Sequence, residues 1–146
     1  MKDFIAVATD AALKAGRMLR ENIHGLLEIT SKGDINLVTE MDMHSERMIV
    51  KMLRVAFPDH SIVAEDEAKL SNASGHTWII DPLDGTTNYA HGYPCFAVSI
   101  VLRHEDYVIL GVVYDPMRDE LFAAQKGRGV YLNGKPIKVS QVGTHS

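Results

Sequence analysis

The sequence predicts an α+β fold in which two N-terminal helices pack on a largely antiparallel sheet. In the first part of the chain, apolar residues recur every three or four positions, which is the spacing of one helix face. The second part carries short runs of β-forming residues separated by turn-forming residues. Helices followed by a succession of strands, many with hairpin connections, favour α+β over a doubly wound parallel sheet.

The first helix is predicted over residues 3–20. Its apolar face consists of Ile5, Ala8, Ala12, Ala15 and Leu19. Residues 26–30 are short and β-prone, and the Ser-Lys-Gly-Asp sequence at 31–34 is typical of a turn. We therefore expect the first helix to end well before residue 26.

A second helix is predicted from about Thr39 to Phe57. Thr39, followed three residues later by Asp42, resembles a capped helix start. Pro58 marks the end, because proline lacks the N–H that would continue the helix. The stripe expected to face the core consists of Met41, Met48, Ile49, Met52, Leu53 and Phe57.

The chain from residue 61 onward is predicted to be rich in strands. Residues 61–64 and 77–80 are short apolar runs, as expected of buried strands. Asn133-Gly134 lies between β-forming residues and is a strong signal of a hairpin. Four further strand-forming ranges are 95–103, 107–114, 120–124 and 129–139, the last with this turn at its centre.

Size and charge narrow the class of protein. The 146 residues, with a net charge of -4 and 46% hydrophobic residues, indicate one soluble globular domain over residues 1–146. The mild acidity, without a basic cluster, argues against nucleic acid as a partner. The longest apolar run, residues 95–102, is too short to span a membrane. A single cysteine and a charged amphipathic start predict a cytoplasmic protein.

Two common site chemistries find no support in the sequence. The seven histidines show no zinc-binding spacing, and one cysteine cannot supply a zinc finger. Cys95 is the one candidate thiol nucleophile, but it begins an apolar range and has no cation beside it. We expect Cys95 to be a buried packing residue.

An apolar strand at residues 78–80 runs directly into two carboxylates, Asp81 and Asp84. Asp-Pro and Asp-Gly both form turns, so a plain chain reversal also accounts for this segment. A turn does not account for Glu65, which follows the apolar run at residues 61–64. If the two strands are neighbours that point the same way, Glu65, Asp81 and Asp84 converge at one edge of the sheet.

Three converging carboxylates repel one another, so they must either take up protons or bind cations. Oxygen ligands select hard cations, with Mg²⁺ first, and Mg²⁺ commonly also contacts a substrate phosphate. Gly85, Thr86 and Thr87 follow directly and offer backbone N–H groups and hydroxyls. If they open a helix, its positive end favours a phosphate next to the metal.

These segments resemble the signatures of the inositol monophosphatase family of Mg²⁺-dependent, lithium-sensitive phosphatases. The sequence at 81–89 is similar to the family's D-P-[IL]-D-G-T-T-N-[FY] signature. Residues 34–42 and 64–66 resemble its D-x-V-T-x-x-D and G-E-E elements, in the same order and spacing, with Ala64 and Asp66 as mild departures. The resemblance covers nearly the whole chain.

The resemblance implies a set of metal ligands. Glu65, Asp81, Asp84 and the backbone carbonyl of Leu83 would ligate Mg²⁺, with two or more ions per site in the intact enzyme. The cofactor expected from the resemblance is therefore Mg²⁺.

The resemblance also implies roles in substrate binding and catalysis. Gly85 and Thr86 would hold the phosphate, and Asp42, Glu65 and Thr86 would orient and help deprotonate a metal-bound water. The implied activity is hydrolysis of inositol monophosphate or a related sugar phosphate. A fructose-1,6-bisphosphatase, a nucleotide-phosphate phosphatase of the same superfamily, and a non-catalytic interaction domain that retains the fold stay open as alternatives.

Family members continue into a second half that contains a W-D-x-A-A-G element, and this sequence has no such element. Residues 1–146 are thus expected to be the amino-terminal, metal- and phosphate-binding half of the layered α/β/α/β/α fold, with the carboxy-terminal half absent. We expect weak activity from these residues alone. We also expect a homodimer or other self-association, because a half fold leaves apolar surface uncovered.

Overall fold

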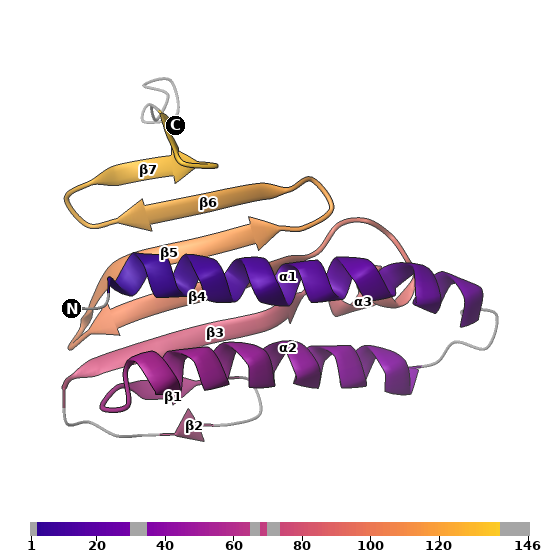
Figure 1. Ribbon diagram of the computed structural model, residues 1–146, viewed down its shortest axis with the longest axis horizontal. Helices are drawn as coiled ribbons and strands as arrows, with labels where there is room; N and C mark the ends of the chain where they lie inside the picture. The colour runs from indigo at the N-terminus through magenta and orange to yellow at the C-terminus, as the bar shows by residue number, and fades with distance from the viewer. Residues whose placement is uncertain (1–2, 30–34, 65–67, 70–73, 138–146) are drawn as a thin grey trace.

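Two long helices, α1 (Phe4–Ile29) and α2 (Ile35–Ala56), lie side by side across one face of an eight-stranded sheet in a computed structural model of the chain (Figure 1). The structure describes residues 3–29, 35–64, 68–69 and 74–137. The predicted α+β class, with two N-terminal helices on a largely antiparallel sheet, is confirmed.

The sheet has the strand order β2-β1-β3-β4-β5-β6-β7-β8, and β1 and β3 are its parallel pair. From β3 to β8 each strand pairs antiparallel with the next one along the chain. The strands are β1 (Ser61–Val63), β2 (Ala68–Lys69), β3 (His76–Asp84), β4 (Ala97–His104), β5 (Tyr107–Asp115), β6 (Glu120–Gln125), β7 (Gly129–Leu132) and β8 (Lys135–Ile137). A short helix, α3 (Thr86–Ala90), connects β3 to β4.

The core lies between the two long helices and the sheet. Every second residue of β4 faces this core, and Val98, Ile100 and Leu102 are fully buried. From the helices, Leu19 of α1 and Leu53 of α2 are equally inaccessible to solvent. Burial at three- and four-residue intervals along the helices is the pattern that the sequence predicts, while β4 shows the period of two that is ordinary for a strand.

Two local predictions about the helices are wrong. Residues 26–29 belong to α1, which continues to Ile29, although they were expected to be β-prone. Leucine and glutamate in this segment are good helix formers, so the segment extends a helix that has already formed. Thr39 lies inside α2, which begins at Ile35, and so it does not cap the helix.

The predicted hairpin at Asn133-Gly134 is confirmed up to residue 137. Asn133 and Gly134 have positive φ angles of 50° and 82°, as the tight turns that join twisted strands require. The Asn133 side chain also accepts a hydrogen bond from the Leu121 N–H at 2.7 Å. This contact ties the hairpin to β6.

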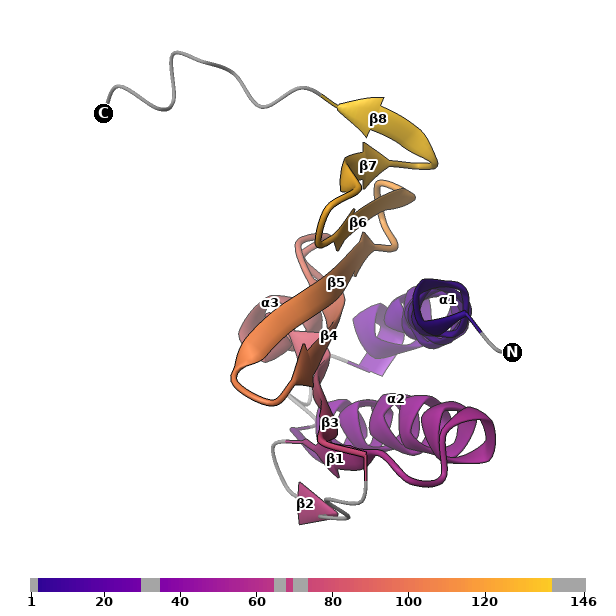
Figure 2. The same ribbon diagram turned by 90° about the vertical axis from the view of Figure 1, so that its left-hand side faces the viewer.

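The sheet face opposite α1 and α2 carries no described helix other than the short α3 (Figure 2). We call this side of the sheet the open face. Strand register places apolar residues in two neighbouring rows on it. The rows are Ile79, Val101, Gly111, Ala124, Val130 and Ile137, and then Val113, Phe122 and Leu132. Ile79, Val113 and Phe122 are 39%, 40% and 37% exposed.

None of the described helices has the length and apolar character needed to cross a membrane.

Candidate functional site

β1 and β3 are parallel neighbours, which is the arrangement that the proposed convergence of carboxylates requires. Ile62 pairs with Trp78 and Val63 pairs with Ile79. Chains that leave parallel neighbours in the same direction emerge at the same edge of a sheet. Glu65 follows β1 by two residues in the sequence but lies outside the described residues, so its convergence with Asp81 stays a prediction.

Asp81 and Asp84 face the same side of the sheet because of a β-bulge between them. Asp81 pairs with Ser99 and Asp84 pairs with Ala97, and the register shifts between these two pairs. Since Ser99 and Ala97 are two residues apart on β4, they share a face, and so do their partners. Asp81 to Asp84 thus form the end of β3, and a plain turn does not describe them.

Pro82 and Leu83, which together lie opposite Val98 in the bulge, are buried. Proline suits a bulge because it has no N–H to offer to a sheet ladder. Its carbonyl accepts a 2.7 Å hydrogen bond from the hydroxyl of Ser45, which is fully buried on α2. Asp81 is half-buried and Asp84 is exposed, so the pair lies at the border between protein and solvent.

Gly85 turns the chain from the bulge into α3. Its φ of 98° is in the left-handed region, and a Cβ at this position would lie 3.0 Å from the Cys95 carbonyl oxygen and 3.3 Å from Phe96 Cα. A side chain therefore cannot be accommodated without a backbone shift. Because Gly85 permits this turn, a helix begins at Thr86, two residues after Asp84.

The start of α3 leaves polar groups available next to the two carboxylates. The Tyr89 N–H donates to the Gly85 carbonyl at 2.9 Å, which closes the first helical turn, and no side chain caps it. N–H groups in a first turn have no partner within their own helix. Thr86 is exposed, so its hydroxyl and the neighbouring N–H groups can donate to an oxyanion.

Tyr89 anchors α3 to the core. Its ring is fully buried and packs edge-on against Phe96, with the ring centroids 4.9 Å apart. Its hydroxyl donates to the Leu19 carbonyl of α1 at 2.8 Å, and burial raises the pKa of Tyr89 to about 12. We did not single out this anchor from the sequence, although an aromatic residue after three polar ones is a usable signal.

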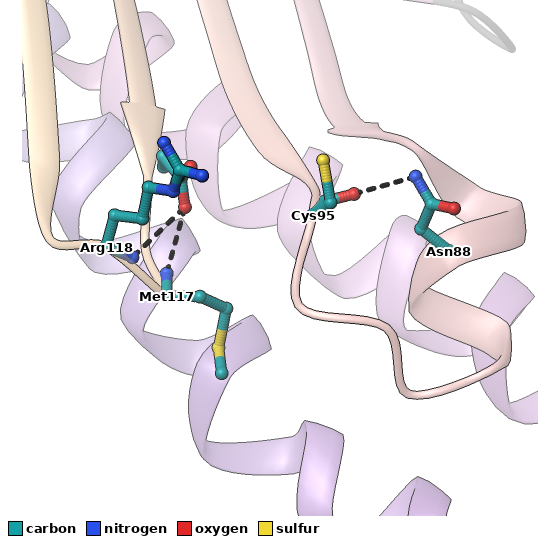
Figure 3. A network of polar contacts seen from close by, with 5 residues as sticks. Asn88, Cys95, Met117 and Arg118 are labelled. Atoms are coloured by element: carbon teal, nitrogen blue, oxygen red, sulfur yellow. Dashed lines mark hydrogen bonds and ion pairs between the residues drawn. The ribbon is translucent and has the colours of Figure 1, made fainter.

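Cys95 is exposed and precedes β4, which begins at Ala97, so the prediction of a buried packing residue is wrong. Its carbonyl oxygen accepts a hydrogen bond from the Asn88 side chain at 3.0 Å (Figure 3). The backbone at Cys95 thus supports the loop after α3, while the thiol faces solvent.

Asp42 reaches the neighbourhood of the bulge through α2. It is half-buried and lies one helical turn before Ser45, so the two side chains occupy the same side of the helix. Since Ser45 contacts Pro82, α2 brings this side of the helix to the end of β3. The described candidate site therefore joins α2, the bulge and the start of α3.

The described residues supply part of a donor set for a hard cation. Asp81 and Asp84 contribute carboxylate oxygens on one face, and Mg²⁺ typically takes one or two carboxylates together with water. Within the described ranges, no group of three or more histidine, cysteine, aspartate or glutamate side chains is placed to hold a metal ion. The third predicted carboxylate, Glu65, lies outside those ranges. These oxygen donors suit a hard cation such as Mg²⁺, and the roles of Asp81, Asp84, Glu65 and the Leu83 carbonyl as metal ligands stay predictions.

Comparisons with known proteins agree with the sequence signatures. A model of the inositol monophosphatase family matches residues 1–146. Inositol monophosphatase 1 of Solanum lycopersicum is 44% identical over 144 residues, which are 96% of this chain and 53% of that protein. The fructose-1,6-bisphosphatase/inositol-1-monophosphatase of Aquifex aeolicus is 42% identical over 141 residues, covering 95% of this chain and 53% of that protein.

A solved structure gives the same result for the fold. Inositol monophosphatase from Anabaena is 45% identical and has a TM-score of 0.80, with 94% of this chain and 50% of that chain covered. This chain spans about half the length of the curated relatives it matches.

Proposed function

The chain belongs to the inositol monophosphatase family, and from this we propose that it is the amino-terminal, metal- and phosphate-binding half of a Mg²⁺-dependent phosphomonoesterase. The proposed substrate is inositol monophosphate or a related sugar phosphate. The single observation that carries the proposal is the bulge that turns Asp81 and Asp84 to the same face beside Gly85. Relatives named inositol monophosphatases match along nearly the whole chain, which supports a phosphatase.

The proposed metal ligands are Glu65, Asp81, Asp84 and the carbonyl of Leu83, which together would hold two or more Mg²⁺ ions. Bound Mg²⁺ supplies Lewis-acid chemistry to the attacking water and to the departing alkoxide. Two carboxylates on one face repel each other, and a bound cation would relieve that repulsion.

Gly85 and Thr86 are the proposed phosphate-binding residues. The Thr86 hydroxyl and the N–H groups of the first turn of α3 would donate to the phosphate oxygens, directly after the second carboxylate. Gly85 allows the backbone to approach closely at this point because it has no side chain.

Asp42, Glu65 and Thr86 are the proposed catalytic residues. They would orient the attacking water and accept its proton as the water oxygen bonds to phosphorus and the P–O bond to the alcohol breaks. The position of Asp42 one turn before Ser45 supports this role, because Ser45 touches the bulge between the metal ligands.

The Aquifex relative, named as both a fructose-1,6-bisphosphatase and an inositol-1-monophosphatase, favours fructose 1,6-bisphosphate as a second candidate substrate. Residues that contact the sugar ring would decide between the two substrates. We further propose a cytoplasmic location, inhibition by lithium and self-association of the chain.

Phosphate release from a substrate panel, with and without Mg²⁺, tests the proposal. The panel contains inositol 1-phosphate, fructose 1,6-bisphosphate and a nucleoside 3′-phosphate, and the control is the Asp84→Asn variant. We expect weak, Mg²⁺-dependent release from the sugar phosphates that Asp84→Asn abolishes. Release only from the nucleotide would favour a nucleotide-phosphate phosphatase. Absence of both turnover and Mg²⁺ binding would favour a non-catalytic interaction domain.

A further inference from the structure

We infer that Ser45 is a positioning residue, whose hydroxyl holds the β3 bulge in the form that presents Asp81 and Asp84 on one face. This inference rests on the proposed function for its consequence in metal binding. Its starting point is the 2.7 Å hydrogen bond from Ser45 Oγ to the Pro82 carbonyl, between residues 37 apart in the sequence.

The Pro82 carbonyl lies in a buried part of the chain where a bulge interrupts the sheet ladder. Extra residues in a bulge are left without ladder partners, and a buried carbonyl without a partner is unfavourable. The hydroxyl of Ser45 is fully buried and supplies that partner from another element. The bond therefore favours the bulged form of β3 over a regular strand.

Serine would not be the expected residue at position 45 if its only role were to form α2. Serine is a poorer helix former than alanine, and in a helix interior its hydroxyl commonly returns to a carbonyl of its own helix. Here it bonds to β3 instead, while Ile49 and Leu53 of the same helix are fully buried and hold α2 in place. The Ser45 hydroxyl is thus held in place by a helix that is packed against the core.

Relaxation of the bulge would separate the two carboxylates. In a regular strand, residues three apart face opposite sides, so a strand without the bulge would turn Asp84 away from Asp81. Ser45 also lies one turn after Asp42, so the same bond fixes the distance between α2 and the carboxylate pair. Loss of the hydroxyl is therefore expected to weaken metal binding more than it weakens the fold.

The test compares Ser45→Ala with Ser45→Thr, which keeps a hydroxyl, and with Tyr114→Phe. Tyr114→Phe is the matched control because it also removes a buried hydroxyl, whose 2.6 Å hydrogen bond goes to Asp119. Mn²⁺ affinity is measured by electron paramagnetic resonance and thermal stability by calorimetry. We expect Ser45→Ala to weaken Mn²⁺ binding by about tenfold or more, as for other residues that orient metal ligands. Ser45→Thr should bind within about threefold of the unmodified chain, and Tyr114→Phe should lower stability without changing affinity.

Equal Mn²⁺ affinity in Ser45→Ala and the unmodified chain would overturn the inference, as would equal weakening by Tyr114→Phe. If Ser45→Ala does not fold, Ser45→Cys takes its place, because it keeps nearly the same volume and donates only weakly.

A measurement without metal separates this inference from the proposed function. Nuclear Overhauser contacts between Asp84 and Ala97 report the bulged register directly. We expect Ser45→Ala to weaken these contacts and Tyr114→Phe to keep them. If the unmodified chain binds no Mn²⁺ but Ser45→Ala still loses the register, the proposed function fails and the positioning role of Ser45 stands. An unchanged register in Ser45→Ala overturns the positioning role whether or not metal binds.

Discussion

Asp81 and Asp84 share one face of the sheet although they are three positions apart along a single strand. Their partners on β4, Ser99 and Ala97, are two residues apart, and the bulge takes up the difference. In a strand with the ordinary period of two, the carboxylates would point to opposite faces. The bulge is therefore the local feature on which the proposed metal site depends.

Asp84→Asn is expected to weaken Mn²⁺ binding by about tenfold or more without lowering thermal stability. Asp84 is exposed, so its charge contributes to the proposed donor set more than to packing. Isothermal titration with Mn²⁺ measures the affinity. The control is Asp106→Asn, an exposed aspartate in the turn between β4 and β5. A comparable loss in both variants would mean that Asp84 acts only through overall charge.

Gly85→Ala is expected to destabilise the fold by roughly 2 kcal/mol or more. The left-handed conformation costs an alanine about 1–2 kcal/mol, and the added Cβ also meets the Cys95 carbonyl oxygen at 3.0 Å. Gly127→Ala is the matched control, because Gly127 has a φ of 81° but no atom within 4 Å of an added Cβ. Urea unfolding measures both free energies. Equal losses in the two variants would rule out the steric contribution at Gly85.

Tyr89→Phe is expected to lower the free energy of unfolding by about 1 kcal/mol, since it removes one buried hydrogen bond and keeps the ring. The bond joins the Tyr89 hydroxyl to the Leu19 carbonyl at 2.8 Å. Tyr93→Phe, at a position 62% exposed, should change nothing and serves as the control. Chemical denaturation measures the free energy of unfolding, and its dependence on denaturant concentration should be the same in the variant and in the unmodified chain. If Tyr89→Phe leaves the free energy of unfolding unchanged, packing of the ring alone anchors α3.

A column of aromatic rings at the other end of β3 predicts a loss of stability in acid. The Trp78 indole N–H donates to His60 Nδ1 at 2.9 Å. His60 stacks on Phe57 and on His76, and His76 stacks on His104, with ring centroids 4.2–4.8 Å apart. Burial, reinforced by the neighbouring His76, lowers the pKa of His60 from 6.5 to about 4.

Because the pKa of His60 is lower in the folded chain, the unfolded chain takes up the proton first on acidification. The stabilising effect of neutral His60 is therefore complete above about pH 6.5 and is lost as the pH falls toward about 4. Trp78 is the only tryptophan in the chain, so its fluorescence should change over the same range. His60→Gln should flatten the dependence of the melting temperature on pH, while His44→Gln, at an exposed position on α2, should not. An identical pH profile for His60→Gln and the unmodified chain would contradict this prediction.

The open face predicts self-association of the chain. Contiguous exposed apolar surface commonly marks an interface, and the open face carries two apolar rows without a covering helix layer among the described residues. Sedimentation equilibrium should detect a dimer that Phe122→Lys converts to a monomer. Val55→Lys adds the same charge at an apolar residue of α2 that is 70% exposed, and it should leave the dimer intact. If the unmodified chain is a monomer at every concentration tested, the open face does not mediate self-association.

Much of the fold could be predicted from the sequence because it depends on local periodicity. The strand-forming range at residues 95–103 and the Asn133-Gly134 pair are visible in a few consecutive residues, and the structure confirms a strand at Ala97–His104 and the hairpin turn. The parallel pairing of β1 with β3 was only the condition on which the convergence of carboxylates depended, and the structure meets that condition. The errors fell where local preference is weak, as at residues 26–29 and at Thr39.

The geometry of the candidate site could be predicted only in part. The residue types of Asp81, Asp84 and Gly85 were informative, because paired carboxylates before a glycine are a chemical signal in themselves. The bulge was not predictable, since it depends on pairing with β4 and on a hydrogen bond from Ser45 across the core. Such contacts between distant residues have no periodic pattern in the sequence.

The most direct measurement is the location of Mn²⁺ in crystals of the chain by anomalous diffraction. We expect an anomalous peak within bonding distance of the carboxylates of both Asp81 and Asp84, on the face of the sheet that the bulge gives them. A peak bound to only one of these carboxylates, a peak elsewhere, or no peak in crystals grown with excess Mn²⁺ would contradict this expectation.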